Sequence, residues 1–444
     1  MAERVAVIGA GVAGLAAAKA LVDAGLEVTI LEARDRIGGR VRTTTSPGLI
    51  VPVELGAEFL HGQADEIAGI ATPEGLRLVD IAGRRWNSKR GRLAVMDDFW
   101  ERLDRVMRRL DGKRARDRSF ADALSATRST RADDRQLALQ YVEGFHAADP
   151  FSISERSLAE GGSPRGDVRE RRIGRVLEGY GAIVDALART LRDHLRLNAE
   201  VRSIRWRRGA VEVRHVDRSS GESSSTTADA AIVTLPLGVL QSAAGSEGAV
   251  AFEPAVPAIE RNVTRLCMGH VMKVVLQLDE PFWAGEEFAK HAGDDRFDTL
   301  SFLHSRDVVA FPVWWTPYPV RAPLLVGWRG GPVARELSRM TRDAVIARAI
   351  ESLATIVGMR ARTISRRVAA AFVHDWTNDP YSRGAYSYVG VDGDNAARML
   401  ARPVERTLFF AGEHADREGR NGTVHGAIAS GREAAERVLG ASGA

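Results

Sequence analysis

The chain has 444 residues, 45 % hydrophobic and 27 % charged, a composition typical of a soluble globular protein with two or three core-forming units. The formal net charge of +4 is scattered, and the densest basic run, residues 101–118, contains no aromatic side chain, so we expect a solvated helix face and no nucleic-acid partner. A single cysteine, Cys267, excludes an intramolecular disulfide, and the lack of a long apolar run, leader peptide or hydrophobic tail predicts a cytoplasmic protein without a membrane anchor.

A stretch near the N-terminus has the pattern of a nucleotide-binding unit. RVAVIG is a predicted buried strand, residues 13–24 a predicted helix, and EVTIL a second strand. Gly9, Gly11 and Gly14 stand where the first strand becomes the helix, and Glu32 stands at the end of the second strand. Glycine at these places permits a tight turn, close approach of a pyrophosphate and close helix–strand packing, while Glu32 can accept from a ribose hydroxyl. The sequence therefore predicts a dinucleotide-binding domain of the Rossmann type.

The next segment, EARDRIGGR, stands where simple nicotinamide enzymes would continue with another helix, and it resembles the flavin-containing amine oxidases. In that family the glycines and arginine of GGR hold the pyrophosphate of FAD. The resemblance implies FAD contacts for Arg34, Gly39 and Arg40. A solvated loop of glycines and arginines is the alternative.

Residues 50–62, IVPVELGAEFLHG, resemble the second flavin segment of many polyamine oxidases. The match implies that four consecutive residues line the flavin: Gly56, Ala57, Glu58 and Phe59. It also implies that His61 faces the substrate cavity, which makes His61 a catalytic candidate. The alternative is a loop histidine whose hydrogen bonds serve only the structure. Some polyamine oxidases carry an acid at this position, and its absence here weakens the case for a polycationic substrate.

The middle of the chain carries fewer chemical signals. Residues 86–172 are largely helical in pattern and contain no chemical motif, and residues 178–195 form another predicted helix. Residues 197–206 and 211–216 are predicted strands joined by a hairpin turn at RRG. By the resemblance, the backbone of Val201 in the first of them meets the adenine.

A lysine follows in a strand of alternating pattern, CMGHVMKVVLQLDEPFW. The family has a lysine in this kind of strand that reaches flavin N5 through a water, which makes Lys273 a catalytic candidate. A surface lysine is the alternative. The aromatic segment 311–328 is predicted to be sheet core more than cavity lining.

The segment WTNDPYSRGAYSY is again similar to the family pattern. It implies that Trp376 packs beside the flavin ring and that Tyr386 forms one wall of an aromatic cage as a catalytic candidate, with a buried core tyrosine as the alternative. Ala385 stands where monoamine oxidases have the cysteine that bonds the flavin. We therefore expect FAD to be bound without a covalent link.

The C-terminal segment LFFAGEHADREGRNGTVHG is the strongest late match. By the resemblance, Gly412 and Glu413 lie near the ribityl chain and pyrophosphate. A helix is predicted to begin near Thr423, and Thr423 and Val424 would then direct its N-terminus at the flavin pyrimidine ring. The positive end of the helix dipole there would stabilise an anionic reduced flavin.

The resemblance implies an α/β fold in which a discontinuous Rossmann-type FAD-binding domain, residues 1–82, 176–260 and 376–444, is combined with an α+β substrate domain, residues 83–175 and 261–375. It implies oxidation of a polyamine, or of a related primary or secondary amine, by hydride transfer to flavin N5. Oxygen is then reduced to hydrogen peroxide and the imine is hydrolysed to an aldehyde. The expected partners are a small-molecule amine and oxygen, with no metal.

Two other functions stay open because a fold does not fix a function. One is another flavin oxidoreductase of this fold, such as a desaturase or an amino-acid oxidase, which would need an arginine for the substrate carboxylate. The other is a non-catalytic binding protein that only retains FAD.

Overall fold

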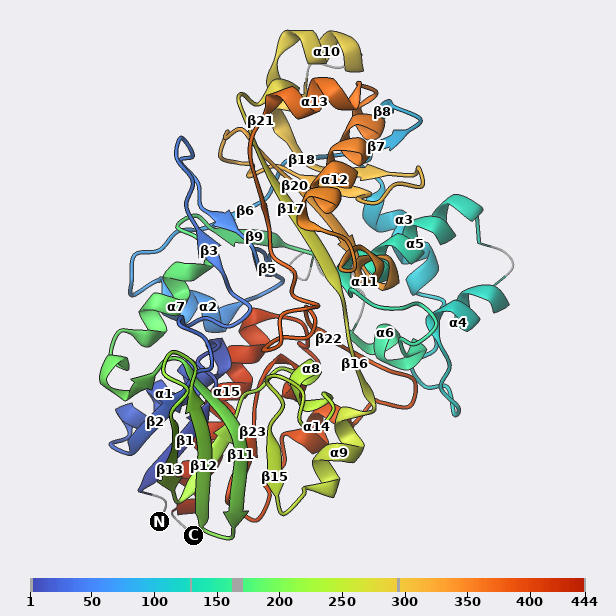
Figure 1. Ribbon diagram of the computed structural model, residues 1–444. Helices are drawn as coiled ribbons and strands as arrows, with labels where there is room; N and C mark the ends of the chain where they lie inside the picture. Colours follow the sequence, from blue (N-terminus) through green and yellow to red (C-terminus); the bar gives the residue numbers. More distant parts are fainter. Residues whose placement is uncertain (1–2, 128–129, 162–170, 294–295, 443–444) are drawn as a thin grey trace.

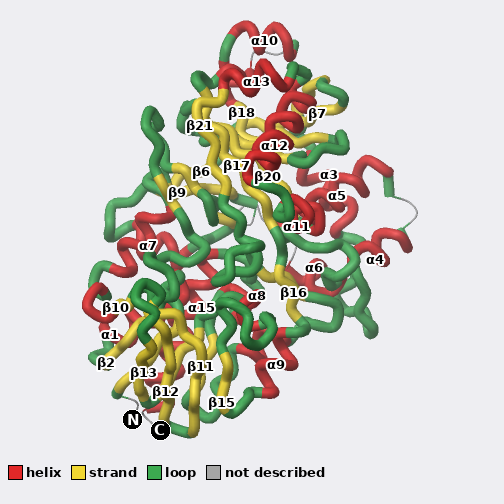
Figure 2. Tube along the Cα trace, viewed as in Figure 1, coloured by secondary structure: helices red, strands yellow, loops and turns green. Residues whose placement is uncertain are grey.

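The structure is a computed structural model that describes residues 3–127, 130–161, 171–293 and 296–442. Two main sheets organise it. Figure 1 places a five-stranded sheet beside both chain ends and a seven-stranded sheet at the opposite end of the molecule. Figure 2 shows the same separation, with strands gathered at the two ends and helices packed around them.

The five-stranded sheet is parallel, as expected for a Rossmann-type domain. In spatial order its strands are β10 (Leu195–Arg196), β2 (Glu27–Leu31), β1 (Arg4–Ile8), β14 (Ala230–Val233) and β23 (Leu408–Phe410). The predicted strand–helix–strand unit is confirmed, and its helix α1 spans Val12–Asp23.

Both faces of this sheet are buried, because side chains alternate along each strand. On β1, Val5 and Val7 pack into the core formed with the helices, whereas Ala6 and Ile8 pack into a second core under a four-stranded sheet. The helices on the first face are α1, α2 (Asp65–Ala71), α7 (Tyr180–Ala188) and α15 (Val424–Ser442). The covering sheet has the order β13 (Ser223–Ala228), β12 (Ala210–Asp217), β11 (Ala199–Arg207) and β15 (Ala251–Glu253). The predicted hairpin at RRG is the β11–β12 connection.

The seven-stranded sheet is mixed: β7 and β18 are parallel, and its other neighbours are antiparallel. In spatial order its strands are β21 (Val368–Val373), β17 (Val271–Leu278), β20 (Leu324–Gly330), β19 (Val313–Trp315), β18 (Leu300–Ser305), β7 (Arg84–Lys89) and β8 (Arg92–Val95). One face forms a core with the helices α10 (Glu286–Ala292), α11 (Pro332–Leu337), α12 (Arg342–Val357) and α13 (Ala361–Arg367). Met272, Val274 and Leu276 of β17 belong to that core, so Lys273 and Val275 point to the other face.

Smaller elements join the two sheets. The remaining helices are α3 (Phe99–Met107), α4 (Phe120–Ala126), α5 (Ala132–Phe145), α6 (Glu155–Gly161), α8 (Leu237–Leu240), α9 (Pro257–Val263) and α14 (Ala396–Leu400). The short paired strands are β3 (Thr43–Thr44) with β4 (Val53–Glu54), β16 (Leu266–Met268) with β22 (Ser387–Val389), and β5 (Leu60–His61) and β6 (Leu78–Asp80) on either side of β9 (Ile173–Val176). None of the described helices is long and apolar enough to cross a membrane.

The structure corrects two expectations for the middle of the chain. The region 86–172 does not begin with helix: β7 and β8 form a hairpin, because Trp86 packs into the sheet core against Phe297. The predicted helix over 101–118 ends at Met107, and ion pairs hold some of the arginines in this run, such as Arg102 with Asp134. Residues 128–129 and 162–170 of this region lie outside the described residues.

The crossing of α1 and α15 predicts a matched pair of glycine substitutions. A Cβ atom at Gly431 of α15 would lie 2.1 Å from the carbonyl oxygen of Ala13 in α1, whereas a Cβ at Gly440 meets nothing within 4 Å. Gly431→Ala should therefore force the helices apart and lower the free energy of unfolding by roughly 1–3 kcal/mol. Gly440→Ala should leave it unchanged or raise it by up to about 1 kcal/mol, because alanine favours helix. Urea unfolding of both variants checks this, and equal stability of the two would refute the packing argument.

Candidate active site

A cavity of about 1210 Å³ lies between the two main sheets, and residues from the whole length of the chain line it. Every residue predicted for the site lines this cavity except Gly14, which lies behind it. The predicted residues brought together are Gly9, Gly11, Glu32, Arg34, Gly39, Arg40, Gly56, Ala57, Glu58, Phe59, His61, Val201, Lys273, Trp376, Tyr386, Gly412, Glu413, Thr423 and Val424.

The glycine end of the cavity has no room for side chains. Gly9 has φ +103°, and a Cβ at Gly14 would lie 2.0 Å from the carbonyl oxygen of Gly9. A Cβ at Gly39 would lie 3.2 Å from the Cα of Gly11. The bare backbone and the first N–H groups of α1, which have no intrahelical partner, therefore face the cavity. This cradle fits a pyrophosphate.

Glu32 has a structural contact on each carboxylate oxygen. Oε2 accepts from the backbone N–H of Ala10 at 2.8 Å and Oε1 from that of Arg34 at 2.9 Å. Each oxygen keeps acceptor capacity for a further donor such as a ribose hydroxyl. The predicted ribose contact is therefore compatible with the geometry, and it stays a prediction.

The two predicted arginines are tied to the C-terminal third of the chain. Arg34 donates to Asp379 at 2.6 Å and to the Ser382 hydroxyl at 2.8 Å. Arg40 donates to the carbonyl oxygen of Ala385 and to Glu413, both at 2.8 Å. Both guanidinium groups therefore join the loop after β2 to the WTNDPYSRGAYSY segment.

Glu413 has a role that sequence reasoning missed. Its carboxylate accepts from Arg40, from the backbone and hydroxyl of Ser387, and from the N–H of Gly422. Burial alone would raise the pKa of Glu413, but Arg40 and these hydrogen bonds outweigh it, so the pKa lies below its usual value. Because protein donors occupy both oxygens, Glu413 positions the wall of the cavity, and a direct contact to the ribityl chain stays a prediction.

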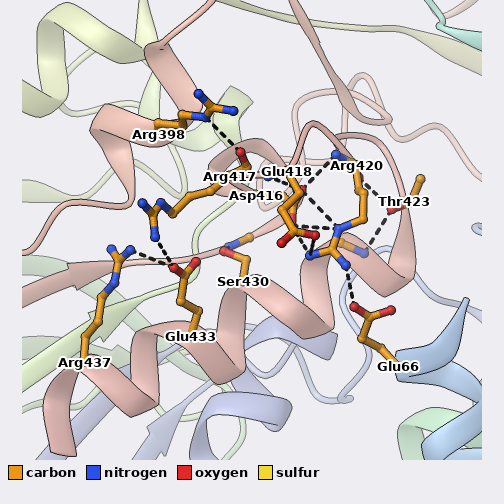
Figure 3. Close-up of polar contacts among 12 residues, drawn as sticks. Glu66, Arg398, Asp416, Arg417, Glu418, Arg420, Thr423, Ser430, Glu433 and Arg437 are labelled. Carbon is orange, nitrogen blue, oxygen red and sulfur yellow. Dashed lines mark hydrogen bonds and ion pairs between the residues drawn. The ribbon is translucent and has the colours of Figure 1, made fainter. Parts of the chain in front are cut away.

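The loop before α15 is fixed by an ion-pair network. Figure 3 shows the guanidinium of Arg420 in contact with the carboxylates of both Asp416 and Glu66. The Thr423 hydroxyl donates to the carbonyl oxygen of Arg420 and accepts from the N–H of Gly426, so Thr423 caps α15. The predicted helix start is confirmed, with Val424 as the first helical residue.

Lys273 is buried, with 3 % of its side chain exposed, so a surface role is excluded. Its Nζ donates to Glu58 Oε2 at 2.7 Å and to the carbonyl oxygen of Gly56 at 3.2 Å. Glu58 also accepts from Trp315 Nε1 at 2.9 Å and lies 3.4 Å from Arg175. Burial would raise the pKa of Glu58, but Lys273 and Arg175 lower it below its usual value. The ammonium of Lys273 has three N–H donors, and Glu58 and Gly56 accept from two of them. The third N–H can donate to a water or a ligand.

Beyond Lys273 the cavity forms an aromatic compartment, whose lining includes the rings of Phe59, Phe145, Phe302, Trp315 and Tyr386. His61 packs edge-on against Phe145 at 5.0 Å and against Phe59 at 6.1 Å between ring centroids. Burial, with smaller effects of His425 and His146, lowers the pKa of His61 to about 4, so it is neutral at physiological pH. Tyr386 donates to the carbonyl oxygen of Phe145 at 2.8 Å, and its ring lies against Gly422.

Trp376 and Val201 line the cavity at two other points. Trp376 is buried and donates from Nε1 to the carbonyl oxygen of Leu55 at 2.8 Å. Val201 lies on β11 where the pairing with β12 is irregular, between Val201 and Ser203. An irregular ladder can leave backbone groups free for a ligand, which is compatible with the predicted adenine contact.

Several lining residues were missed by sequence reasoning. Residues from β7, α3, α5, β18 and β20 contribute Arg85, Phe99, Trp100, Tyr141, Phe145, Phe302, His304 and Trp328. The alternation of the strands could have found part of this set. In β19, Trp314 packs in the core whereas Trp315 faces the cavity, so the aromatic segment 311–328 serves both purposes.

The comparisons with known proteins agree with this geometry. The sequence profile described as flavin containing amine oxidoreductase matches residues 12–439. The chain belongs to that family. Its cofactor is therefore FAD, and the glycine cradle described above fits the pyrophosphate of that group.

The relatives and solved structures include oxidases of several amines. Polyamine oxidase 3 of Oryza sativa subsp. japonica is 30 % identical over 97 % of this chain and 88 % of its own length. Wild-type putrescine oxidase bound to putrescine is similar in fold, with a TM-score of 0.80 at 22 % identity over 99 % of both chains. Cyclohexylamine oxidase from Brevibacterium oxydans IH-35A has a TM-score of 0.80 at 21 % identity over the full length of both.

The site predicts that FAD is released intact by acid precipitation. Ala385 provides no nucleophile, and Cys267, the single cysteine of the sequence, pairs with Tyr388 in β16–β22 and does not line the cavity. The supernatant should contain all of the flavin, measured by its absorbance and by mass spectrometry of the protein pellet. Flavin mass retained on the chain would contradict the prediction.

Proposed function

We propose that the protein oxidises the C–N bond of a small-molecule amine with oxygen as the acceptor. The carbon next to nitrogen loses a hydride and nitrogen loses a proton, which leaves an imine that water hydrolyses to an aldehyde and free amine. FAD, when bound, accepts the hydride at N5 and passes both electrons to oxygen, which becomes hydrogen peroxide. We further propose, from the single cysteine, a reducing cytoplasmic location.

The observation that carries the proposal is the buried Lys273–Glu58 pair at the junction between the cofactor cradle and the aromatic compartment. A cation held in a place from which water is largely excluded stabilises negative charge that develops nearby when electrons pass to oxygen. Because Glu58 and Gly56 hold the ammonium, its position is fixed before any substrate enters.

The aromatic compartment favours the neutral form of the amine. Glu58 is the carboxylate beside Lys273, and Lys273 and Arg175 already neutralise it. His61 is neutral, because its burial is the main cause that lowers its pKa to about 4. An ammonium entering this compartment would lose its hydration without gaining a counter-charge, whereas a neutral amine packs against Phe59 and Tyr386 at low cost. A polyamine, as in the relatives named above, or a related primary or secondary amine, is the substrate class that these relatives support.

The proposal predicts a rise of reaction rate with pH. An alkyl ammonium titrates near the lysine value of about 10.4, so the neutral fraction increases roughly ten-fold per pH unit below it. At subsaturating amine, the rate of anaerobic flavin reduction should rise from pH 7 to pH 9 in proportion to the neutral fraction of the amine. His61 is already neutral over this range, so it should add no second ionisation to the pH profile. Stopped-flow absorbance measures this. A flat profile for the stable enzyme would count against oxidation of a neutral amine.

Lys273→Met is expected to slow the reaction with oxygen. Methionine keeps the length of the side chain but removes the charge, so reduction by amine should change modestly while reoxidation slows at least ten-fold, about 1.4 kcal/mol of barrier. Anaerobic and aerobic stopped-flow traces separate the two half-reactions. Normal reoxidation in a variant that retains FAD would refute the role proposed for Lys273.

Removing Lys273 also takes from the buried Glu58 a hydrogen bond and one of its two counter-charges, which leaves Arg175 at 3.4 Å, and this loss can disturb the site by itself. The double variant Glu58→Gln with Lys273→Met removes both charges and is the matched control. If the lost cation is the cause, the double variant should reoxidise as slowly as Lys273→Met. If the altered environment of the Glu58 carboxylate is the cause, the double variant should reoxidise faster than Lys273→Met.

A further inference from the structure

Arg85 lines the cavity at the end of the aromatic compartment that lies away from Lys273. It is on β7, paired with Phe302, which is paired in turn with Trp315. The row continues through Val326 to Val275 of β17. Residues paired directly across strands project to the same face, so Arg85 and Lys273 lie on the same side of the sheet.

The Arg85 guanidinium has no carboxylate and no hydrogen-bond acceptor among the described residues. It lies over three aromatic rings instead, at 5.3 Å from Phe99, 5.6 Å from Trp100 and 5.2 Å from Phe302. Burial lowers the pKa of Arg85 to about 10, and no acidic neighbour offsets that effect. The group is still charged at pH 7.

Three other cations at the cavity differ from Arg85 in this respect. Arg34 is paired with Asp379, Arg40 with Glu413, and Lys273 with Glu58. A partly buried charge costs free energy unless it is paired. Arg85 therefore stands out as a cation whose partner is missing from the described part of the chain.

His304 provides a second unmatched group beside Arg85. It lies two residues after Phe302 on β18, lines the cavity, and is stacked on Phe99 at 5.2 Å. Its Nε2 is buried without a hydrogen-bond partner in the described structure. Burial, and then Arg85, lower the pKa of His304 to about 3, so the ring is neutral and can donate one hydrogen bond without adding charge.

We propose that Arg85 binds a carboxylate carried by the amine substrate, so that the substrate is an aminocarboxylate with its amine and its carboxylate at opposite ends. A planar guanidinium binds a carboxylate through two parallel hydrogen bonds, and the aromatic rings around it exclude water that would weaken them. The inference rests on the proposed amine oxidation at that same site, and it replaces the polyamine of the relatives by an amine that carries a carboxylate.

The position of Arg85 sets the distance between the two ends. Between β7 and β17 lie four strand-to-strand spacings, roughly 19 Å between the backbones at about 4.8 Å each. Phe302 stands between Arg85 and Phe59, with contacts of 5.2 Å and 5.7 Å on its two sides. With oxidation at the Lys273 end, a carboxylate on the reacting carbon itself cannot reach Arg85. The spacer is therefore several carbons long and apolar, which excludes a simple α-amino acid oxidised at its α-carbon.

The same arginine disfavours a diamine or polyamine. A second ammonium that extends along the aromatic compartment would meet the Arg85 charge, and like charges at close range are repulsive. This separates the present chain from a putrescine-type substrate, although the fold is shared with putrescine oxidase.

The test compares substrates that differ only at the far end. Peroxide release is measured for unbranched ω-aminoalkanoates of four, six and eight carbons, for alkylamines of the same lengths, and for the matching diamines. We expect one aminoalkanoate to have a kcat/KM at least ten-fold above its alkylamine and its diamine. Arg85→Gln should raise the KM for that aminoalkanoate at least ten-fold with little change in kcat, and leave the alkylamine unaffected. Arg85→Lys should fall between, because it keeps the charge and loses the fork.

Arg84→Gln is the matched control, since Arg84 is the neighbouring arginine on β7 and does not line the cavity. It should behave as the unmodified enzyme. Binding of hexanoate, which cannot be oxidised, is measured separately from its perturbation of flavin absorbance and should be lost in Arg85→Gln but kept in Arg84→Gln.

The outcomes distinguish the two proposals. Diamines or alkylamines that are oxidised better than every aminoalkanoate, or Arg85 variants that lose all amines equally, would overturn the carboxylate site and leave the oxidase function standing. Arg85-dependent binding of hexanoate without peroxide release from any amine would support the carboxylate site and overturn the oxidase function.

Discussion

The buried carboxylate of Glu413 holds together three segments that lie far apart in the sequence. It accepts from Arg40 of the GGR loop, from Ser387 of β22, and from Gly422 before α15. Without it, the Ser387 and Gly422 N–H groups would lose their acceptor, and Arg40 would keep the carbonyl oxygen of Ala385 but lose its counter-charge, which is the most costly of these losses. The wall of the cofactor cradle therefore depends on one ion pair, and helix α15 can direct its N-terminus at the cavity because the loop before it is fixed.

The alternation of the seven-stranded sheet decides where the cavity can be. Each strand gives one set of side chains to the core with α12 and the other set to the cavity, as with Trp314 and Trp315 in β19. Close packing of the core face keeps the strands in register, so Lys273 and Arg85 are held at fixed places on the opposite face. The rigid sheet thus sets the length of the compartment between them.

Local patterns selected cofactor-end residues that come together in one cavity, because these residues lie in short continuous segments of the sequence. Gly9, Gly11 and Gly39 are needed at their positions for steric reasons. A family motif made of such residues can therefore be matched to this sequence residue by residue. The substrate end was predicted poorly, because Arg85 and Phe302 come together only through strand pairing across more than 200 residues of sequence. Arg85 stands just before the predicted helical region 86–172, next to Arg84, and its position in the sequence gave no signal. The hairpin was missed because its polar strand residues follow no clean alternation, and only packing of Trp86 against the core explains it.

The distribution of charge gives the two halves of the cavity different tasks. The cofactor half is crowded with compensated charges, Arg34 with Asp379 and Arg40 with Glu413, so it can hold a polar group without large rearrangement. In the other half His61 and His304 are kept neutral by burial, and Glu58 is neutralised by Lys273 and Arg175. Selectivity in such a compartment cannot come from a general attraction of cations. Selectivity must come from the fit of an apolar chain between aromatic rings and from a ligand group that pairs with Arg85. In this half of the cavity, Arg85 is the guanidinium that the described residues leave without a counter-charge.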